Sequence, residues 1–351
     1  MNMKHKLSII FPLLALLLLA ACSSDNNDDA KGGREITLDI PIDIYSANTE
    51  VSTRAADQGD PGNDVVFNAP LYLYVYAYIS EANGSSYELL TQTFTYTEEE
   101  ASSAWTLQNK NTADECWRKN VRVTFRLGTT FNNVLGKSRV YAIASRTDLS
   151  KVLPTVTGST SSYTTMAALE AMTMNCADFT SDQLRDIYST PANDRSNPAK
   201  STDNGIIVEN NNILTCSTVK LYHVAAKMDF TWEIPSSLRS SVEIQQIECT
   251  GLPINCKVFV PTDNPTGTGS TIVIGPSSTT TNAANFIDEG NKWIGRAYAF
   301  MLQPPSPGTV NYTVTFGGSG SRTNTTGSIT PSSDTYSNIY TGWYRVIADV
   351  K

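Results

Sequence analysis

The chain has 351 residues, with 34 Asp and Glu against 26 Lys and Arg, and its formal net charge is −8. No basic cluster interrupts this acidic balance, so nucleic acid is not expected as a partner. The 2 His and the absence of Cys-x-x-Cys leave no metal-ligand cluster and disfavour a His-assisted nucleophile. We therefore expect no metal, no cofactor and no enzymatic activity.

The chain begins with the layout of a secretory signal peptide, predicted over residues 1–21. Lys4 and Lys6 form a short basic start, and an apolar run over 7–21 ends in Leu-Ala-Ala before Cys22. This run of about fifteen residues is shorter than the roughly twenty that cross a bilayer as a helix. Leu-Ala-Ala-Cys is also a lipobox, which predicts lipidation of Cys22 and attachment to outer-membrane lipid.

A polar, acidic segment follows, and residues 22–33 are predicted to be a lipidated tether without a fold of its own. Loss of Lys4 and Lys6 with the signal peptide would change the net charge from −8 to −10. Acidic residues directly after a lipid-bearing Cys resemble the surface-export signals of Bacteroidetes lipoproteins. We expect the protein at the cell surface.

The rest of the sequence predicts an all-β protein with short helices, arranged as two β-sandwich domains in tandem. Segment 34–54 contains the first strand, and the domains are predicted over 55–210 and 211–351. Pro41 suggests an edge position or a bulge in the first strand. Five aliphatic side chains alternate with other residues along that strand: Ile36, Leu38, Ile40, Ile42 and Ile44.

Alternation and β-branched or aromatic content predict further strands along the chain. The segment 71–79 alternates Tyr with aliphatic residues, which favours a strand covered on both faces. Short helices are predicted at 166–172 and 181–187, and the polar stretch 191–204 is predicted as a linker or long loop. The other predicted strands are 121–127, 139–144, 219–232, 241–248, 256–260, 270–274, 293–302, 309–316 and 343–350.

Five cysteines remain beyond Cys22, an odd number. Cys249 and Cys256 are close enough in sequence for a hairpin to bring them to bridging distance in an oxidising compartment. They form a candidate disulfide or a pair of buried thiols. His223 lies in an apolar run and is expected to be a packed or surface residue.

The order of these features resembles the fimbrillin family of Bacteroidetes pilins. The resemblance covers the lipobox, the first strand, the strands at 71–79 and 140–144, and Thr53-Arg54-Ala55. Segment 219–230 resembles the strand that opens the second domain in such proteins, although His223 stands where the family commonly has Arg. The resemblance implies transthyretin-like sandwiches and a structural subunit of a surface fimbrium, with other fimbrial subunits as partners.

The resemblance also implies a maturation mechanism. An arginine-specific protease would cut between Arg54 and Ala55 and release residues 22–54 with the lipid and the first strand. The groove left behind would accept an extended segment of another subunit. Without such a protease, Arg54 would be an ordinary linker residue.

The last strand has two interpretations. As a donor to another subunit it would make the chain a shaft pilin, which the sequence modestly favours. If it completes the sheet of its own domain instead, the chain would be a tip or capping subunit. The apolar positions of this candidate donor strand are Tyr344, Val346, Ala348 and Val350.

The main alternative function is a surface glycan-binding lipoprotein of a polysaccharide-uptake system. Such a protein needs exposed aromatic platforms, whereas a strand-acceptor protein needs its first strand to be an integral part of the core. Core packing is the more ordinary role for tryptophans in strands. The candidate platform residues are Trp105, Trp117, Trp232, Trp293 and Trp343.

Overall fold

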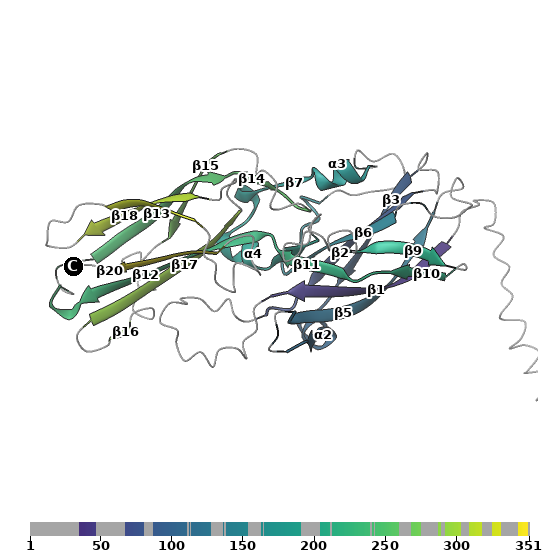
Figure 1. Ribbon diagram of the computed structural model, residues 1–351, viewed down its shortest axis with the longest axis horizontal. Coiled ribbons are helices and arrows are strands. Elements are labelled where there is room, and N and C mark those ends of the chain that lie inside the picture. The colour runs from purple at the N-terminus through teal and green to yellow at the C-terminus, as the bar shows by residue number, and fades with distance from the viewer. Residues whose placement is uncertain are drawn as a thin grey trace, which may run out of the picture.

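The fold is described from a computed structural model. The described residues are 35–46, 67–80, 87–110, 112, 114–127, 136, 138–153, 163, 165–190, 204–210, 213–238, 241, 243–259, 268–274, 287–288, 292–302, 309–317, 325–330 and 343–349. They form two β-sandwiches that lie end to end along the long axis of the molecule (Figure 1). This confirms the predicted all-β class and its tandem sandwiches.

The N-terminal sandwich is one ten-stranded sheet that folds back on itself, with the order β10-β9-β6-β8-β11-β1-β5-β4. Strand β6 also pairs with β2, and β2 pairs with β3. The bounds are β1 Glu35–Tyr45, β2 Tyr72–Ser80, β3 Tyr87–Thr95, β4 Thr106–Gln108, β5 Cys116–Arg126, β6 Ser138–Ser145, β8 Ile187–Ser189, β9 Ile206–Asn210, β10 Ile213–Cys216 and β11 Val219–His223.

Strand β2 is buried on both faces, as its sequence predicts. Leu73 and Val75 lie in the core of the sandwich, while Tyr74 and Tyr76 lie in a second cluster on the opposite face. Tyr74 is held there by its hydroxyl, which donates to Asp148 at 2.8 Å and accepts from the Leu149 amide at 2.8 Å. Strand β2 therefore contributes side chains to two hydrophobic clusters, one on each of its faces.

Short helices connect the strands. Helix α2 (Glu98–Ala104) begins at a capping box in which Thr97 and Glu100 satisfy each other's backbone amides. Helix α4 (Ser181–Arg185) begins at a second box formed by Thr180 and Gln183. The remaining short elements are α3 Met166–Glu170, η3 Cys176–Asp178, η5 Ser236–Leu238 and β7 Thr173–Asn175.

The C-terminal sandwich consists of two four-stranded sheets, β16-β17-β12-β20 and β15-β13-β18-β19. Their facing side chains, including Phe230, Trp232 and Ile247, form a separate core. The bounds are β12 Ala225–Pro235, β13 Glu243–Pro253, β15 Thr268–Ile274, β16 Ile287–Asp288, β17 Lys292–Leu302, β18 Val310–Gly317, β19 Thr325–Ile329 and β20 Trp343–Asp349.

A hydrogen-bonded junction ties the sandwiches together. Strand β14 (Asn255–Lys257) of the C-terminal half pairs with β7 of the N-terminal half. Phe259 packs edge-on against Tyr76 and Tyr141, with ring centroids 5.8 and 5.2 Å apart. The Ser189 hydroxyl donates to the Val258 carbonyl at 2.6 Å. Aromatic packing and backbone pairing together fix one sandwich against the other.

The boundary between the sheets differs from the predicted division at 210/211. Strands β9, β10 and β11 all belong to the N-terminal sheet, and the first strand of the C-terminal sheets is β12. The single strand predicted over 219–232 is two strands, separated at Val224. The apolar run continues through Val224, and neither strand length nor alternation marks the change of sheet. The change from the N-terminal sheet to the C-terminal sheets therefore falls at Val224.

Candidate strand-acceptor site

Strand β1 lies inside the N-terminal sheet and not at its edge. It pairs antiparallel with β5 from Glu35 opposite Arg126 to Ile44 opposite Trp117. On its other side it pairs in parallel with β11, from Ile42 opposite Val219 to Tyr45 opposite Tyr222. Figure 1 shows β1 between these two neighbours. Removal of β1 would therefore divide the sheet.

The position of Pro41 rules out the bulge that the sequence suggested and agrees with the suggested edge position, because β1 pairs there with β5 but not with β11. Pro41 stands opposite Asn120 in an uninterrupted ladder with β5, so β1 has no bulge there. It comes directly before Ile42, where the ladder with β11 begins. Pro41 has no amide hydrogen to donate, and it lies in the half of β1 that pairs with β5 alone among the described strands.

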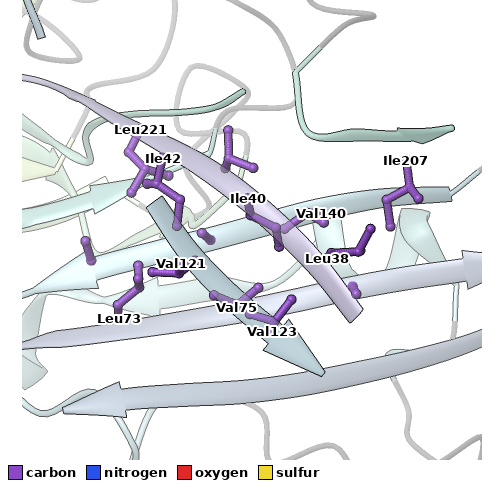
Figure 2. Packing of buried hydrophobic residues seen from close by; sticks show 14 of the residues in the cluster. Leu38, Ile40, Ile42, Leu73, Val75, Val121, Val123, Val140, Ile207 and Leu221 are labelled. Carbon is purple, nitrogen blue, oxygen red and sulfur yellow. The ribbon is translucent and has the colours of Figure 1, made fainter. Parts of the chain in front are cut away.

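The inner face of β1 forms the centre of the core. Figure 2 shows Leu38, Ile40 and Ile42 among side chains of β2, β5, β6 and β11. Burial of one aliphatic side chain contributes roughly 1.5–3 kcal/mol. The burial of five such side chains therefore contributes a free energy comparable with the whole unfolding free energy of an ordinary domain, about 5–15 kcal/mol. All five predicted residues are exposed by 1% or less: Ile36, Leu38, Ile40, Ile42 and Ile44.

The outer face of β1 carries two carboxylates that form bidentate ion pairs with β5. The Arg118 guanidinium donates through Nε and Nη2 to the two oxygens of Asp43, both at 2.6 Å. Arg122 donates in the same way to Asp39, at 2.7 and 3.0 Å. Planar guanidinium and carboxylate groups match in this arrangement, which gives orientation as well as energy.

The two ion pairs differ in burial. The side chain of Asp43 is 4% exposed and that of Arg118 is 37% exposed, whereas Asp39 and Arg122 are 67% and 72% exposed. The hydrogen bond from Arg122 lowers the pKa of the Asp39 carboxyl below its ordinary value. Water and salt screen the Asp39 pair much more than the Asp43 pair.

The end of β1 is fixed by an aromatic contact. The Tyr45 ring stacks on the Tyr222 ring of β11, with centroids 4.9 Å apart and planes inclined by 8°. Cys116 lies buried beside Asp43, and its burial together with the nearby carboxylate raises the pKa of the thiol to about 12. This thiol stays protonated at neutral pH and is not a reactive group.

The processing residues lie outside the described part of the chain. This applies to Cys22, to the cleavage pair Arg54 and Ala55, and to Val350 at the end of the candidate donor strand. Lipidation and cleavage therefore remain predictions from the sequence. Arg54 follows β1 in sequence, so a cut there would separate β1 from every later strand.

The candidate donor strand completes the sheet of its own domain. Strand β20 is an edge strand that pairs in parallel with β12, from Trp343 opposite Lys227 to Asp349 opposite Glu233. Tyr344 is fully buried in the C-terminal core, and Val346 packs against it partly buried. Of the two interpretations of the last strand, the structure agrees with the one in which β20 completes the sheet of its own domain.

The candidate disulfide between Cys249 and Cys256 is not formed. Cys249 is a free thiol in the core of the C-terminal sandwich. Cys256 lies on β14 in the cluster at the junction. Strand β13 is irregular after Cys249, and β14 pairs with β7 in a separate two-stranded sheet. The hairpin that the spacing suggested therefore sends the two side chains into different clusters.

The described tryptophans are core residues and not exposed platforms. Trp105 and Trp232 are 4% and 1% exposed, and Trp117 packs on the N-terminal core. Phe67 stacks on Trp117 with centroids 4.5 Å apart. The side chains of Trp293 and Trp343 lie outside the described residues. No aromatic platform for a glycan is present among the three described tryptophans.

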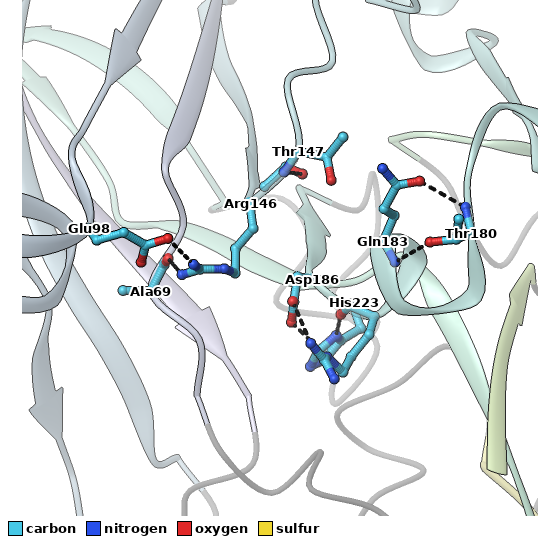
Figure 3. A network of polar contacts seen from close by, with 10 residues as sticks. Ala69, Glu98, Arg146, Thr147, Thr180, Gln183, Asp186 and His223 are labelled. Atoms are coloured by element: carbon cyan, nitrogen blue, oxygen red, sulfur yellow. Dashed lines mark hydrogen bonds and ion pairs between the residues drawn. The ribbon is translucent and has the colours of Figure 1, made fainter. Parts of the chain in front are cut away.

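His223 is buried at the end of β11, as one of its expected roles requires. Its Nδ1 lies 2.7 Å from the Arg185 carbonyl oxygen, and its ring packs on Tyr188. The Arg185 guanidinium forms a two-bond ion pair with Asp186. Figure 3 shows Arg146 joined to Glu98 and to the Ala69 carbonyl. These contacts are structural supports for the loops around the junction.

The described residues contain no group of three or more His, Cys, Asp or Glu side chains placed to hold a metal ion. No helix in the same residues has the length and apolar character needed to cross a membrane.

No family model matches the chain, and no curated protein matches it significantly. Among solved structures it is similar to the tip fimbrial protein Mfa3 from Porphyromonas gingivalis with C-terminal truncation. That match has 11% identity and a TM-score of 0.38, and it covers 84% of this chain and 82% of that one.

The chain is also similar to a "putative cell adhesion protein" from Bacteroides fragilis, with 13% identity and a TM-score of 0.32 over 89% of this chain and 93% of that one. A "putative adhesin" from Bacteroides thetaiotaomicron has 14% identity and a TM-score of 0.32 over 84% and 79%.

Sequence reasoning missed the ion pairs on the outer face of β1. Their signal was present as two Asp residues four positions apart on β1 and two Arg residues four positions apart on β5. In strands, positions four apart share a face. Only the pairing of β1 with β5 shows that Asp39 meets Arg122 and that Asp43 meets Arg118.

Proposed function

We propose that this protein is a subunit of a surface fimbrium that supports adhesion and accepts a strand from another subunit. One observation carries the proposal: β1 is an interior strand whose five aliphatic side chains are fully buried. Removal of such a strand leaves an apolar slot lined by unpaired backbone groups, which is a template for another strand.

The processing steps come from the sequence. The precursor is exported as a lipoprotein, acylated at Cys22 and held at the outer membrane. An arginine-specific protease cuts between Arg54 and Ala55, and residues 22–54 leave with the lipid. The strand of another fimbrial subunit then takes the place of β1, and the protein becomes part of the fimbrium.

We place the chain at the end of a fibre and not in its shaft. A shaft subunit must donate a strand as well as accept one, and β20 is engaged with β12 and contributes Tyr344 to the core. A head-to-tail polymer of one subunit requires both roles, whereas a terminal subunit needs only the acceptor slot.

Limited proteolysis tests the proposal. A chain over residues 23–351 is treated with a limiting amount of trypsin-like protease, the new N-terminus is read, and the product is run unheated on a denaturing gel. We expect a product that begins at Ala55, is kept folded by the cut segment that stays bound in the sheet, and forms no ladder by itself. A ladder of multimers would make the chain a shaft subunit, and resistance of Arg54 to cleavage would overturn the proposal.

Glycan binding is the alternative function, and the same protein tests it. The three described tryptophans are packed in cores, so no specific observation favours this function. The strand-acceptor function predicts that replacement of β1 changes assembly, whereas a glycan-binding protein would be indifferent to it.

A further inference from the structure

The slot left by β1 is charged as well as apolar. With β1 gone, Arg118 and Arg122 would line one outer side of the slot without the carboxylates that now accept their hydrogen bonds. The two arginines are four residues apart on β5, so both project from the same face of the sheet. An incoming strand that fills the apolar positions must also meet these two guanidinium groups.

The two arginines contribute unequally to selection. Asp43 is 3% exposed, so a neutral or cationic side chain in its place would leave the partly buried Arg118 without its acceptor. Arg122 is open to water and can be solvated when its partner is absent. The position opposite Arg118 is therefore the stricter of the two.

We propose that Arg118 and Arg122 select an incoming strand that carries two carboxylates four residues apart, with aliphatic residues alternating on the opposite face. This inference rests on the proposed strand-acceptor function. Electrostatic complementarity attracts a strand with carboxylates at those positions and penalises a strand with cations there. We take the occupant to be an extended segment of a different subunit, since the last strand of this chain carries a cation at one of these positions.

The chain's own last strand does not match this pattern. Its apolar positions alternate with Arg345, Ile347 and Asp349. Arg345 and Asp349 are four residues apart, the same spacing as Asp39 and Asp43. When the strand runs in the direction of β1, the register that brings Asp349 opposite Arg118 brings Arg345 opposite Arg122, and the register that brings Asp349 opposite Arg122 brings Arg345 opposite Arg126. Like charges in that position disfavour self-donation.

Peptide exchange tests the inference on unaltered protein. The full chain is cut at Arg54, and a fluorescent peptide of residues 35–45 is exchanged into it and followed by anisotropy. Three unlabelled competitors are compared with the parent peptide: D39N/D43N, D39R/D43R and residues 343–351. We expect each to compete at least tenfold more weakly than the parent, and D43N alone to lose more than D39N alone.

A charge reversal provides the rescue. R118D/R122D protein should prefer the D39R/D43R peptide over the parent peptide, which reverses the order seen with unaltered protein. The matched control is Arg126→Asp on the same strand, where the arginine is exposed and forms no ion pair within the described residues. This control should leave the order unchanged.

The outcomes separate the two proposals. If the parent peptide itself does not exchange into the cut protein, the strand-acceptor function fails. If the parent and D39N/D43N peptides compete equally, the acceptor function stands and the selection by Arg118 and Arg122 is overturned. Equal competition by residues 343–351 would overturn the exclusion of self-donation.

Discussion

Strands β1 and β20 have the same alternating sequence pattern but different positions in their sheets. Strand β1 has a neighbour on each side and five side chains at the centre of a core. Strand β20 is an edge strand with β12 as its neighbour. Its Tyr344 is buried in the C-terminal core, and its Val346 is partly buried against that core. Alternation shows that a strand has one apolar face, but it does not show how many neighbours the strand has.

The difference separates what each strand can do in assembly. An interior strand leaves a slot when it departs, with β5 along one wall and β11 along part of the other, and so suits an acceptor. An edge strand can leave at lower cost, but its departure exposes the next strand of its own sheet. The same chain therefore contains a good acceptor and a donor that is engaged elsewhere.

The largest expected effect comes from removal of each strand in turn. A chain that begins at Ala55 should have an unfolded N-terminal half, because it lacks side chains whose burial contributes on the order of the whole domain's stability. A chain that ends at Gly342 should keep that half folded. Hydrogen exchange read by mass spectrometry distinguishes the halves, and addition of a peptide of residues 35–45 should refold the first chain. Equal protection in both truncated chains would contradict the comparison.

The next effect concerns the strand beside β20. Lys227 and Asp229 on β12 form an ion pair with Nζ and Oδ2 3.1 Å apart, and both side chains are fully buried. Asp229→Ala leaves a buried ammonium and should cost about 3–5 kcal/mol of unfolding free energy, measured by urea titration. Asp39→Ala on β1 is the matched control, and because its pair is exposed we expect a much smaller loss. A large loss of unfolding free energy in the control would show that exposed ion pairs stabilise the fold as much as buried ones.

A smaller contrast compares single side chains on the two strands. Ile40→Ala should cost about 2–5 kcal/mol, because it opens a cavity in a fully buried site. Val346→Ala should cost less than about 1.5 kcal/mol, since Val346 is only partly buried on an edge strand. Urea midpoints of the two variants measure the difference, and a reversed order would show that β20 is the more tightly held strand.

The smallest expected effect depends on pH. The pKa of Asp39 is lowered in the folded protein, so its contribution to stability is present above its ordinary pKa of 3.8 and is lost as pH falls through the lower folded value. The stability difference between the wild type and Asp39→Asn should therefore shrink below pH 3.8. Urea titrations between neutral pH and pH 2.5 test this, and a difference that grows on acidification would reverse the sign.

Much of the fold could be predicted from local patterns. The strand at 36–44 and the two-faced strand at 71–79 were predicted because alternation is strong and breaks flank them. The short strands β9 and β10 were missed, since they are brief and lie where a division between domains was expected. Likewise, the candidate bridge between Cys249 and Cys256 was suggested by spacing alone and failed because the chain changes sheets between them.

The sequence by itself determined that this is a strand-rich protein with five aliphatic residues on one face of its first strand. It also predicted the signal peptide, the lipobox and the candidate cleavage after Arg54, because those depend on the order of neighbouring residues. Only the tertiary structure decided that β1 is interior, that β20 pairs with its own domain and that Arg118 and Arg122 face Asp43 and Asp39. Pairing between strands joins residues far apart in sequence, and local periodicity carries no information about which strands become neighbours.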